Sequence, residues 1–133
     1  MRWRTASLLT LNLLVATAMA GADQHGTWLA KVPAKDRDGA NPLPNDTAVI
    51  DSGSKIFARN CASCHGKDAQ GTGRRPSLHT ARVQTATDGE LYWLLRNGSI
   101  AKGMPSWSRL PEVQRWELIR YLHSLSLEPD HPQ

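Results

Sequence analysis

The chain has 133 residues, two cysteines and a formal net charge of +4. This length suits one small domain with a leading segment and excludes two separate hydrophobic cores. The excess of basic residues is too small to indicate nucleic-acid binding. We therefore expect a single small domain whose partners do not include nucleic acid.

Residues 1–20 have the features of a secretory signal peptide. Two arginines near the start supply positive charge, Leu8 to Val15 form an apolar run, and small residues precede a cleavage site that we place after Ala20. The run is shorter than the roughly 20 residues of a membrane span, so a retained anchor is only the alternative. We predict export to the bacterial periplasm, with no stable membrane insertion after cleavage.

Residues 21–45 are polar and interrupted by proline and glycine, with no sustained helical or strand periodicity. We predict an extended N-terminal arm or linker over this segment. Two forms of it stay open. It is either a disordered lead-in to the domain or a strap packed over the domain through Trp28 and Leu43.

Two helices are predicted next. The first begins between Asp46 and Asp51, where a capping side chain is present, and ends at about Asn60. The second follows Thr87, whose spacing from Glu90 is that of a capping box, and it stops at Asn97-Gly98. No strand-like alternation or internal repeat is found, which predicts an all-α domain.

A third helix opens at Pro111, a residue tolerated in the first turn, and ends before Pro129. Apolar residues occupy much of its circumference, so it must bury more than one face. We place the domain at residues 46–128 and a C-terminal tail at residues 129–133. A domain of this size with so few large apolar residues has a thin core, and another group should help to fill it.

The pentapeptide Cys61-Ala62-Ser63-Cys64-His65 is the C-x-x-C-H signature of covalent haem attachment. Two cysteines three apart on a helical turn can each form a thioether to one haem, and the adjacent histidine is then carried under the iron. The motif predicts one covalent haem c as the cofactor. A small disulfide loop, a thiol-redox pair and a zinc site are the alternatives, but no strand precedes Cys61 and no further thiolates are available.

Iron in an electron carrier needs a sixth ligand, for which Met104 is the best candidate. It lies in Gly103-Met104-Pro105, where proline fixes the backbone and glycine permits a close approach. A thioether is a soft ligand that raises the reduction potential relative to a second histidine. The alternatives are that Met104 only fills the core or that His79 is the distal ligand. We expect ordinary surface or tail positions for His25, His123 and His131.

These motifs occur in the order found in class I cytochromes c, which the chain resembles from about Asp46 to Leu125. The resemblance rests on Gly53-x-x-x-Phe57, the C-x-x-C-H motif, Gly103-Met104-Pro105 and the run from Leu118 to Leu122. It implies an all-α class I cytochrome c fold, with three to five helices wrapped around one covalently attached haem. It also implies that the first and last helices cross where Gly53 and Phe57 meet Leu118 and Tyr121.

The resemblance further implies that residues 75–78 form the family's proline loop. The carbonyl of Pro76 would then accept a hydrogen bond from the axial His65 and fix its tautomer. The family often has glycine or alanine before this proline, whereas Arg74 and Arg75 stand here. These arginines either pair with haem propionates or form a solvated basic corner.

Two tryptophans are expected near the haem. Trp93 lies on the middle helix and Trp107 follows the methionine by three residues, and either indole N–H can donate to a propionate. The alternative is that both are plain core aromatic residues.

The predicted function is one-electron transfer between redox-partner proteins, without catalysis, by a monomer or by a subunit of a complex. The run from Asp88 to Trp93 together with Arg115-Trp116 is similar to domains found beside dehydrogenases, oxidases and sulfur-oxidation enzymes. A haem c subunit of such a complex is therefore the alternative. Catalysis at the iron would need an open coordination position, which Met104 argues against.

Overall fold

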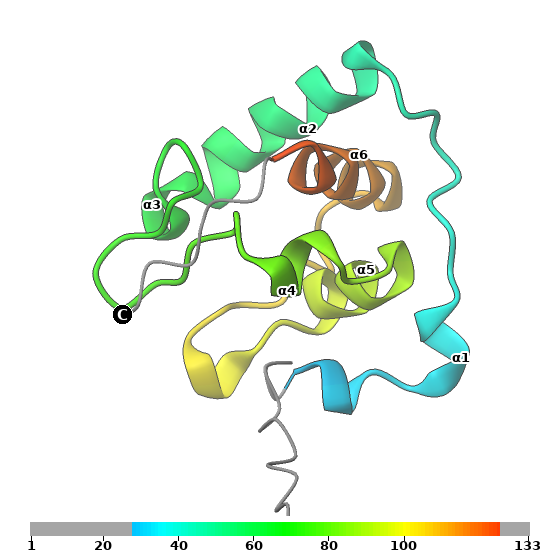
Figure 1. Ribbon diagram of the computed structural model, residues 1–133, viewed down its shortest axis with the longest axis horizontal. Coiled ribbons are helices and arrows are strands. Elements are labelled where there is room, and N and C mark those ends of the chain that lie inside the picture. Colours follow the sequence, from blue (N-terminus) through cyan, green and yellow to red (C-terminus); the bar gives the residue numbers. More distant parts are fainter. Residues whose placement is uncertain (1–27, 126–133) are drawn as a thin grey trace, which may run out of the picture.

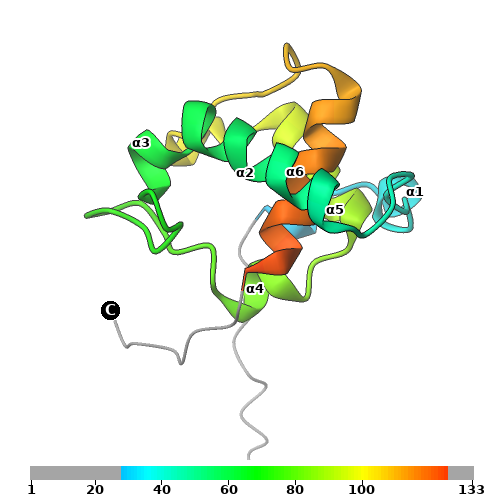
Figure 2. The same ribbon diagram turned by 90° about the horizontal axis from the view of Figure 1, so that it is seen from above.

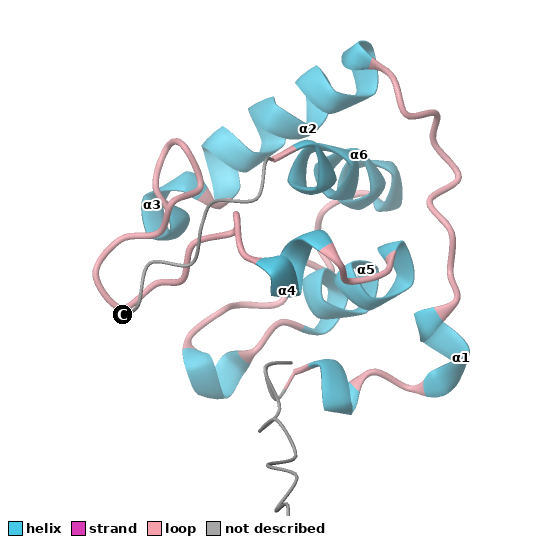
Figure 3. Cartoon of the chain, viewed as in Figure 1, coloured by secondary structure: helices cyan, strands magenta, loops and turns pink. Residues whose placement is uncertain are grey.

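A computed structural model describes residues 28–125, which form short helices joined by loops (Figure 1). This part of the chain contains no strands (Figure 3). The helices are η1 (Leu29–Lys31), α1 (Ala34–Arg37), α2 (Thr47–Asn60), α3 (Ala62–His65), α4 (Ala81–Gln84), α5 (Asp88–Asn97), η2 (Ile100–Lys102) and α6 (Glu112–Ser124). None of these helices is long and apolar enough to cross a membrane. The predicted signal peptide, the start of the arm and the C-terminal tail lie outside the described residues.

The predicted helix starts are confirmed at α2 and α5. The carboxylate of Asp46 accepts from the backbone N–H of Val49 at 2.9 Å. Thr87 Oγ1 accepts from the Glu90 N–H at 3.1 Å, and the Glu90 carboxylate accepts from the Thr87 N–H at 2.9 Å, which completes a capping box. The α5 helix ends at Gly98, whose φ of +72° favours glycine. Local sequence therefore sets these ends.

The α6 helix starts one residue later than predicted. Pro111 has extended backbone angles and precedes the first helical residue, so it is the cap and not part of the first turn. The expectation that α6 buries more than one face is confirmed. Trp116 stacks on Tyr92 of α5 with ring centroids 4.1 Å apart, while Leu118 is buried at 1% exposure.

The α2 and α6 helices cross at a glycine, as the family resemblance predicts (Figure 2). A Cβ atom on Gly53 would lie 2.1 Å from the carbonyl oxygen of Glu117 on α6. One turn further along α2, the Phe57 ring lies 5.2 Å from the Tyr121 ring, centroid to centroid. The missing side chain at Gly53 thus allows the two backbones to meet.

Residues 28–45 pack on the domain and form a strap along one side of it (Figure 1). Asn41 is buried, and its side-chain amide donates to the Trp116 carbonyl at 2.8 Å. Arg120 donates to the carbonyls of Asn41 at 3.2 Å and of Leu43 at 2.6 Å. Of the two forms left open by the sequence, the described residues therefore have the packed one, and they include short helical turns that the polar composition did not indicate.

The strap also approaches α5 at a second glycine. A Cβ atom on Gly89 would lie 2.1 Å from the carbonyl oxygen of Asp36. Close by, Thr87 Oγ1 donates to the Arg37 carbonyl at 2.5 Å, and the Arg37 guanidinium lies 3.7 Å from the Glu90 carboxylate. The residues that cap α5 therefore also hold the strap.

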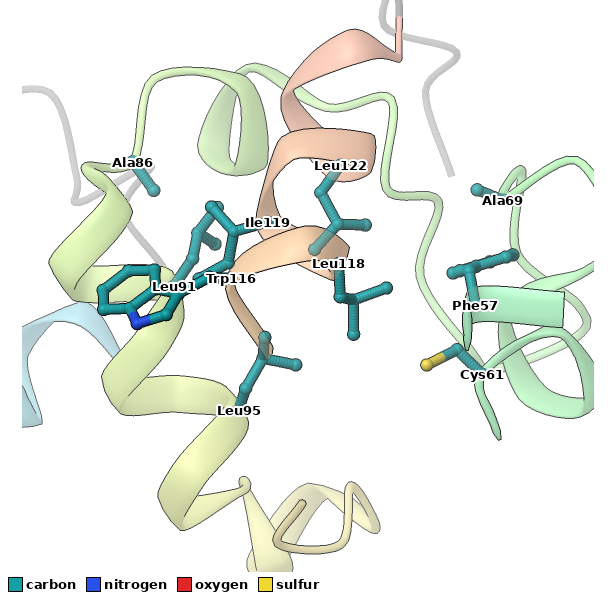
Figure 4. Packing of buried hydrophobic residues seen from close by; sticks show 10 residues of the cluster. All are labelled: Phe57, Cys61, Ala69, Ala86, Leu91, Leu95, Trp116, Leu118, Ile119 and Leu122. Atoms are coloured by element: carbon teal, nitrogen blue, oxygen red, sulfur yellow. The ribbon is translucent and has the colours of Figure 1, made fainter. Parts of the chain in front are cut away.

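The hydrophobic core is small, as expected. Side chains from α5 and α6 form one part of it, and Phe57 with Cys61 approaches from α2 (Figure 4). The buried cluster consists of Phe57, Cys61, Ala69, Ala86, Leu91, Leu95, Trp116, Leu118, Ile119 and Leu122. In Figure 4 the sulfur of Cys61 is directed toward the side of Leu95 and Leu118. This core forms one wall of a large cavity.

Candidate functional site

A cavity of about 1220 Å³ lies beside the core. This exceeds the roughly 300–1,000 Å³ typical of pockets for drug-sized ligands. Its apolar lining includes Phe57, Leu91, Leu94, Leu95, Leu118 and Leu122. The predicted attachment and ligand residues line the same cavity, namely Cys61, Cys64, His65 and Met104. Three chemically distinctive side chains of residues 61–65 and the thioether of Met104, from a segment far along the chain, therefore line one apolar space.

The two cysteines stand at the junction of α2 and α3. Cys61 ends α2, donating its backbone N–H to the Phe57 carbonyl at 2.8 Å, and Cys64 lies within the single turn that follows. Both thiols are free, so the disulfide alternative does not describe this structure. Both sulfurs are thus available to a group in the cavity.

Burial raises the pKa of the Cys61 thiol to about 11, and the neighbouring Cys64 adds to this shift. A thiol-redox pair needs the opposite shift, because the thiolate is its reactive form. Among residues 28–125, no group of three or more His, Cys, Asp and Glu side chains is placed to hold a metal ion, so no zinc site forms around the pair. The environment therefore suits cysteines that are covalently capped.

His65 is oriented by the loop that follows it. Its Nδ1 lies 3.0 Å from the carbonyl oxygen of Pro76. A carbonyl only accepts, so Nδ1 carries the proton and Nε2 is left to bind a metal. The loop closes because Gly71 donates its N–H to the His65 carbonyl at 2.7 Å, and a Cβ atom on Gly71 would lie 2.5 Å from the Arg75 carbonyl oxygen. This is the arrangement that the family resemblance implies for Pro76.

Met104 lies at the end of a loop, residues 99–104, whose two ends are joined by backbone hydrogen bonds. Ser99 and Met104 exchange two backbone hydrogen bonds, of 2.9 and 3.1 Å, around the η2 turn. Gly98 packs against the backbone of Pro105, the residue that follows Met104, since a Cβ atom on Gly98 would lie 2.7 Å from the Pro105 carbonyl. Gly103 takes a left-handed conformation with φ +79°. The predicted glycine, methionine and proline are thus part of one tight turn whose methionine is half-buried.

Charged residues at the cavity are all basic. Arg74, Arg75, Arg82 and Lys102 line it, whereas no Asp or Glu of the described chain does. An apolar space with a basic margin suits a planar apolar group that carries carboxylates, as haem does. The residues present therefore fit haem. Arg75 already has partners in the protein, because its Nη1 lies 3.3 Å from the Lys102 carbonyl oxygen and 3.2 Å from that of Gly103.

The two tryptophans are separated by the structure. Trp107 lines the cavity, and its backbone N–H donates to the Leu95 carbonyl at 2.8 Å. Trp93 does not line this cavity and lies instead at a small hollow with Tyr92 and Trp116. The expectation of a haem contact at Trp93 is therefore corrected. The reason is helical periodicity, because residues two apart on a helix point to different sides and Leu91 and Leu95 already occupy the cavity side.

Two further histidines, His79 and His123, are buried or half-buried. His79 lines the cavity and is buried, but its Nε2 lies 2.7 Å from the Asp68 carbonyl oxygen, which occupies that nitrogen. His123 is half-buried on α6 rather than an ordinary surface residue, with Nδ1 3.8 Å from the Asp88 carboxylate. His25 and His131 lie outside the described residues.

Two contributors to the site were not predicted. Trp28 of the strap lines the cavity, although its sequence signal was only one large aromatic residue in a polar segment. Thr72 Oγ1 donates to the Cys64 carbonyl at 2.6 Å and braces the loop that carries Pro76. Nothing in the local sequence distinguishes Thr72 from other loop threonines.

The helical fold and the C-x-x-C-H motif at the cavity define a class I cytochrome c, a class of proteins with covalent haem c. Within that class the chain belongs to the family described as cytochrome C oxidase, cbb3-type, subunit III, which matches residues 48–122. The chain is 35% identical over 92 residues to the cbb3-type cytochrome c oxidase subunit CcoP of Rhodobacter capsulatus. It is 32% identical over 114 residues to the quinohemoprotein alcohol dehydrogenase ADH-IIG of Pseudomonas putida.

These matches cover 62% and 79% of this chain, but only 31% of CcoP and 15% of the dehydrogenase. The chain thus spans about a third or less of the length of these relatives. Among solved structures, cytochrome cL from Methylophaga aminisulfidivorans matches with a TM-score of 0.56 at 22% identity, covering 63% of this chain and 58% of that one. The c-type cytochrome XoxG from Methylobacterium extorquens matches with a TM-score of 0.52 at 23% identity, covering 59% and 51%. These two structures support the fold.

Proposed function

We propose that this protein transfers single electrons through one haem c attached to Cys61 and Cys64, with the iron held between His65 and Met104. The observation that carries this proposal is the cavity. Two segments far apart in the sequence, residues 61–65 and the loop of Met104, bring the two thiols, the imidazole and the thioether to one apolar space.

The haem, when bound, supplies the one-electron Fe(III)/Fe(II) couple. The protein's residues hold and tune it. The hydrogen bond from His65 Nδ1 to the Pro76 carbonyl keeps the ring in one tautomer and raises the basicity of Nε2. The soft thioether of Met104 favours ferrous iron and so raises the reduction potential. Leucines of α5 and α6 exclude water from the cavity walls.

We further propose that the mature protein works in the periplasm after loss of residues 1–20. Its partners are a donor and an acceptor protein that meet it at the mouth of the cavity. Such encounters are transient, with small interfaces and electrostatic guidance, and the basic margin around Arg74 and Lys102 supplies a charge for that guidance.

A haem-carrying part of a larger assembly is the second candidate. It is favoured by the relatives, one of which is named as an oxidase subunit and another as an alcohol dehydrogenase. The native mass of the haem protein in a periplasmic extract separates the two candidates. A mass near that of the single chain, 14.7 kDa before processing, supports the carrier. Elution as a much larger species with co-migrating oxidoreductase activity supports the assembly.

The ligand set is tested with carbon monoxide. The haem-loaded wild-type protein should bind it weakly when reduced, because Met104 closes the sixth position. Met104→Ala should bind it readily. Ile100→Ala is the matched control, since Ile100 lies in the same loop and the residue is 70% exposed. Equal and tight binding by wild type and Met104→Ala would refute ligation by Met104.

A further inference from the structure

Arg75 links the two loops that present the proposed iron ligands. Its main chain precedes Pro76, which accepts the hydrogen bond of His65. Its guanidinium reaches the loop of Met104, where Nη1 donates to the carbonyls of Lys102 and Gly103. We propose that Arg75 is a positioning residue that holds the Met104 loop closed over the iron. This inference rests on the proposed ligation by His65 and Met104.

The backbone of Arg75 is held in the loop that carries Pro76 by several contacts. Arg75 donates its N–H to the Thr72 carbonyl at 2.9 Å, and its own carbonyl accepts from the Thr72 N–H at 3.2 Å. Gly71 packs directly against the same carbonyl, leaving no space for a side chain. Thr72 in turn is bonded to the Cys64 carbonyl. The guanidinium therefore extends from a loop that is tied to the haem-attachment turn.

The methionine side depends more on this link. Residues 100–103 are all exposed, so the loop has little burial of its own to hold it in place. Segments with few buried contacts open locally at low free energy. A charged donor makes stronger hydrogen bonds to carbonyls than a neutral one. Arg75 thus supplies a strong connection at the point where the ligand loop is least supported.

Gly103 is matched to this contact. A Cβ atom on Gly103 would lie 2.7 Å from Arg75 Nη1, too close for the guanidinium to keep its position. Gly103, the residue before Met104, therefore allows both the left-handed turn and the close approach of the Arg75 guanidinium. Arg74, which precedes Arg75 in the sequence, is exposed and makes neither of the two hydrogen bonds to the Lys102 and Gly103 carbonyls. The two arginines, which look equivalent in the sequence, have different surroundings.

The test compares Arg75→Gln and Arg75→Lys with Arg74→Gln, which removes the same charge from the same margin. The haem-loaded proteins are heated while two signals are followed. One is the weak red absorption band that thioether ligation gives ferric haem, and the other is helix content by circular dichroism. The affinity of each reduced protein for carbon monoxide is measured as well.

We expect Arg75→Gln to lose the red band well below the temperature at which its helices melt. We also expect it to bind carbon monoxide about tenfold more tightly than wild type, the change that loss of a hydrogen bond to a charged group corresponds to. For both the loss of the red band and the affinity for carbon monoxide, Arg75→Lys should lie between Arg75→Gln and wild type. Arg74→Gln should match wild type in both. A purely structural role would lower both melting signals together.

Identical band loss and carbon monoxide affinity in Arg75→Gln, Arg74→Gln and wild type would overturn the inference. Equal effects in Arg74→Gln and Arg75→Gln would do so as well, because they would show an effect of charge alone. If wild type itself lacks the red band, the proposed ligation fails, and this result is distinct from failure of the role given to Arg75.

Discussion

At the site, single backbone groups fix the side chains that face the cavity. The Pro76 carbonyl sets which nitrogen of His65 carries the proton. The backbone pairing of Ser99 with Met104 sets the position of the thioether. In both cases the ligand is held by main-chain atoms of a loop, so the site depends on loop geometry as much as on the ligands.

A residue outside the site gives a pH-dependent prediction. Burial lowers the pKa of His123 below its ordinary value; Asp88 opposes this shift and Arg120 adds to it. The unfolded chain therefore binds a proton at this residue at a higher pH than the folded one. The free energy of unfolding should decrease as the pH falls through the ordinary histidine value of about 6.5.

His123→Gln removes this titration and keeps a polar side chain of similar size. Urea denaturation of the haem-loaded protein from about pH 8 to about pH 5 should show a smaller loss of stability in the variant than in wild type. Equal losses would show that His123 has the same pKa in the folded and unfolded states.

Residue positions were predictable only where the chemistry is local. The C-x-x-C-H motif and the Gly-Met-Pro turn carry their chemistry in adjacent residues, and both are at the cavity. Trp93 was misplaced although the spacing of Leu91 and Leu95 already indicated which side of α5 faces inward. The contact of Arg75 with Gly103 joins residues 28 apart, and no sequence pattern encodes such a pair.

At the scale of elements, the crossing of α2 and α6 is the contact that holds the domain. It was implied by family resemblance and rests on Gly53, where the backbones meet. Helix ends were predictable from caps, with Pro111 displaced by one residue. The packing of the strap was not predictable in this way, because its burial depends on tertiary hydrogen bonds of Asn41 and Arg120 rather than on periodicity.

Gly53→Ala should therefore destabilise the protein. Its Cβ atom would lie 2.1 Å from the Glu117 carbonyl oxygen, so the helices must move apart. Overpacking of this kind costs about 1–3 kcal/mol, and each kcal/mol lowers the melting temperature of a domain this size by roughly 4–8 °C. Thermal unfolding by circular dichroism measures the effect.

Ser52→Ala, on the same helix, is the control and should change the melting temperature little, because alanine favours the helix slightly. A Gly53→Ala protein that melts with the control would contradict the close crossing of the two helices.

At the scale of the whole molecule, the thin core and the large cavity are two aspects of one property. Few large side chains are fully buried in the described part of the chain, namely Phe57, Leu118 and Ile119. Two of them, Phe57 and Leu118, line the cavity of about 1220 Å³. The sequence composition predicted that another group fills the core, and the apolar lining agrees with haem in that place.

The chain produced without haem attachment should therefore lack a stable fold. We expect no cooperative thermal transition and rapid amide hydrogen exchange in α2 and α6, whereas the haem-loaded protein should protect both helices. A haem-free chain that melts cooperatively with protected helices would show that the polypeptide core suffices by itself.

In the proposed site, the iron of one covalent haem c lies between His65 and Met104. Optical spectra of the purified, haem-loaded protein are the first test of this ligation. The oxidised protein should show the weak red band of iron–sulfur ligation, and the reduced protein a sharp low-spin α band. A high-spin ferric spectrum without the red band would contradict ligation by Met104, because it would reveal an open iron position.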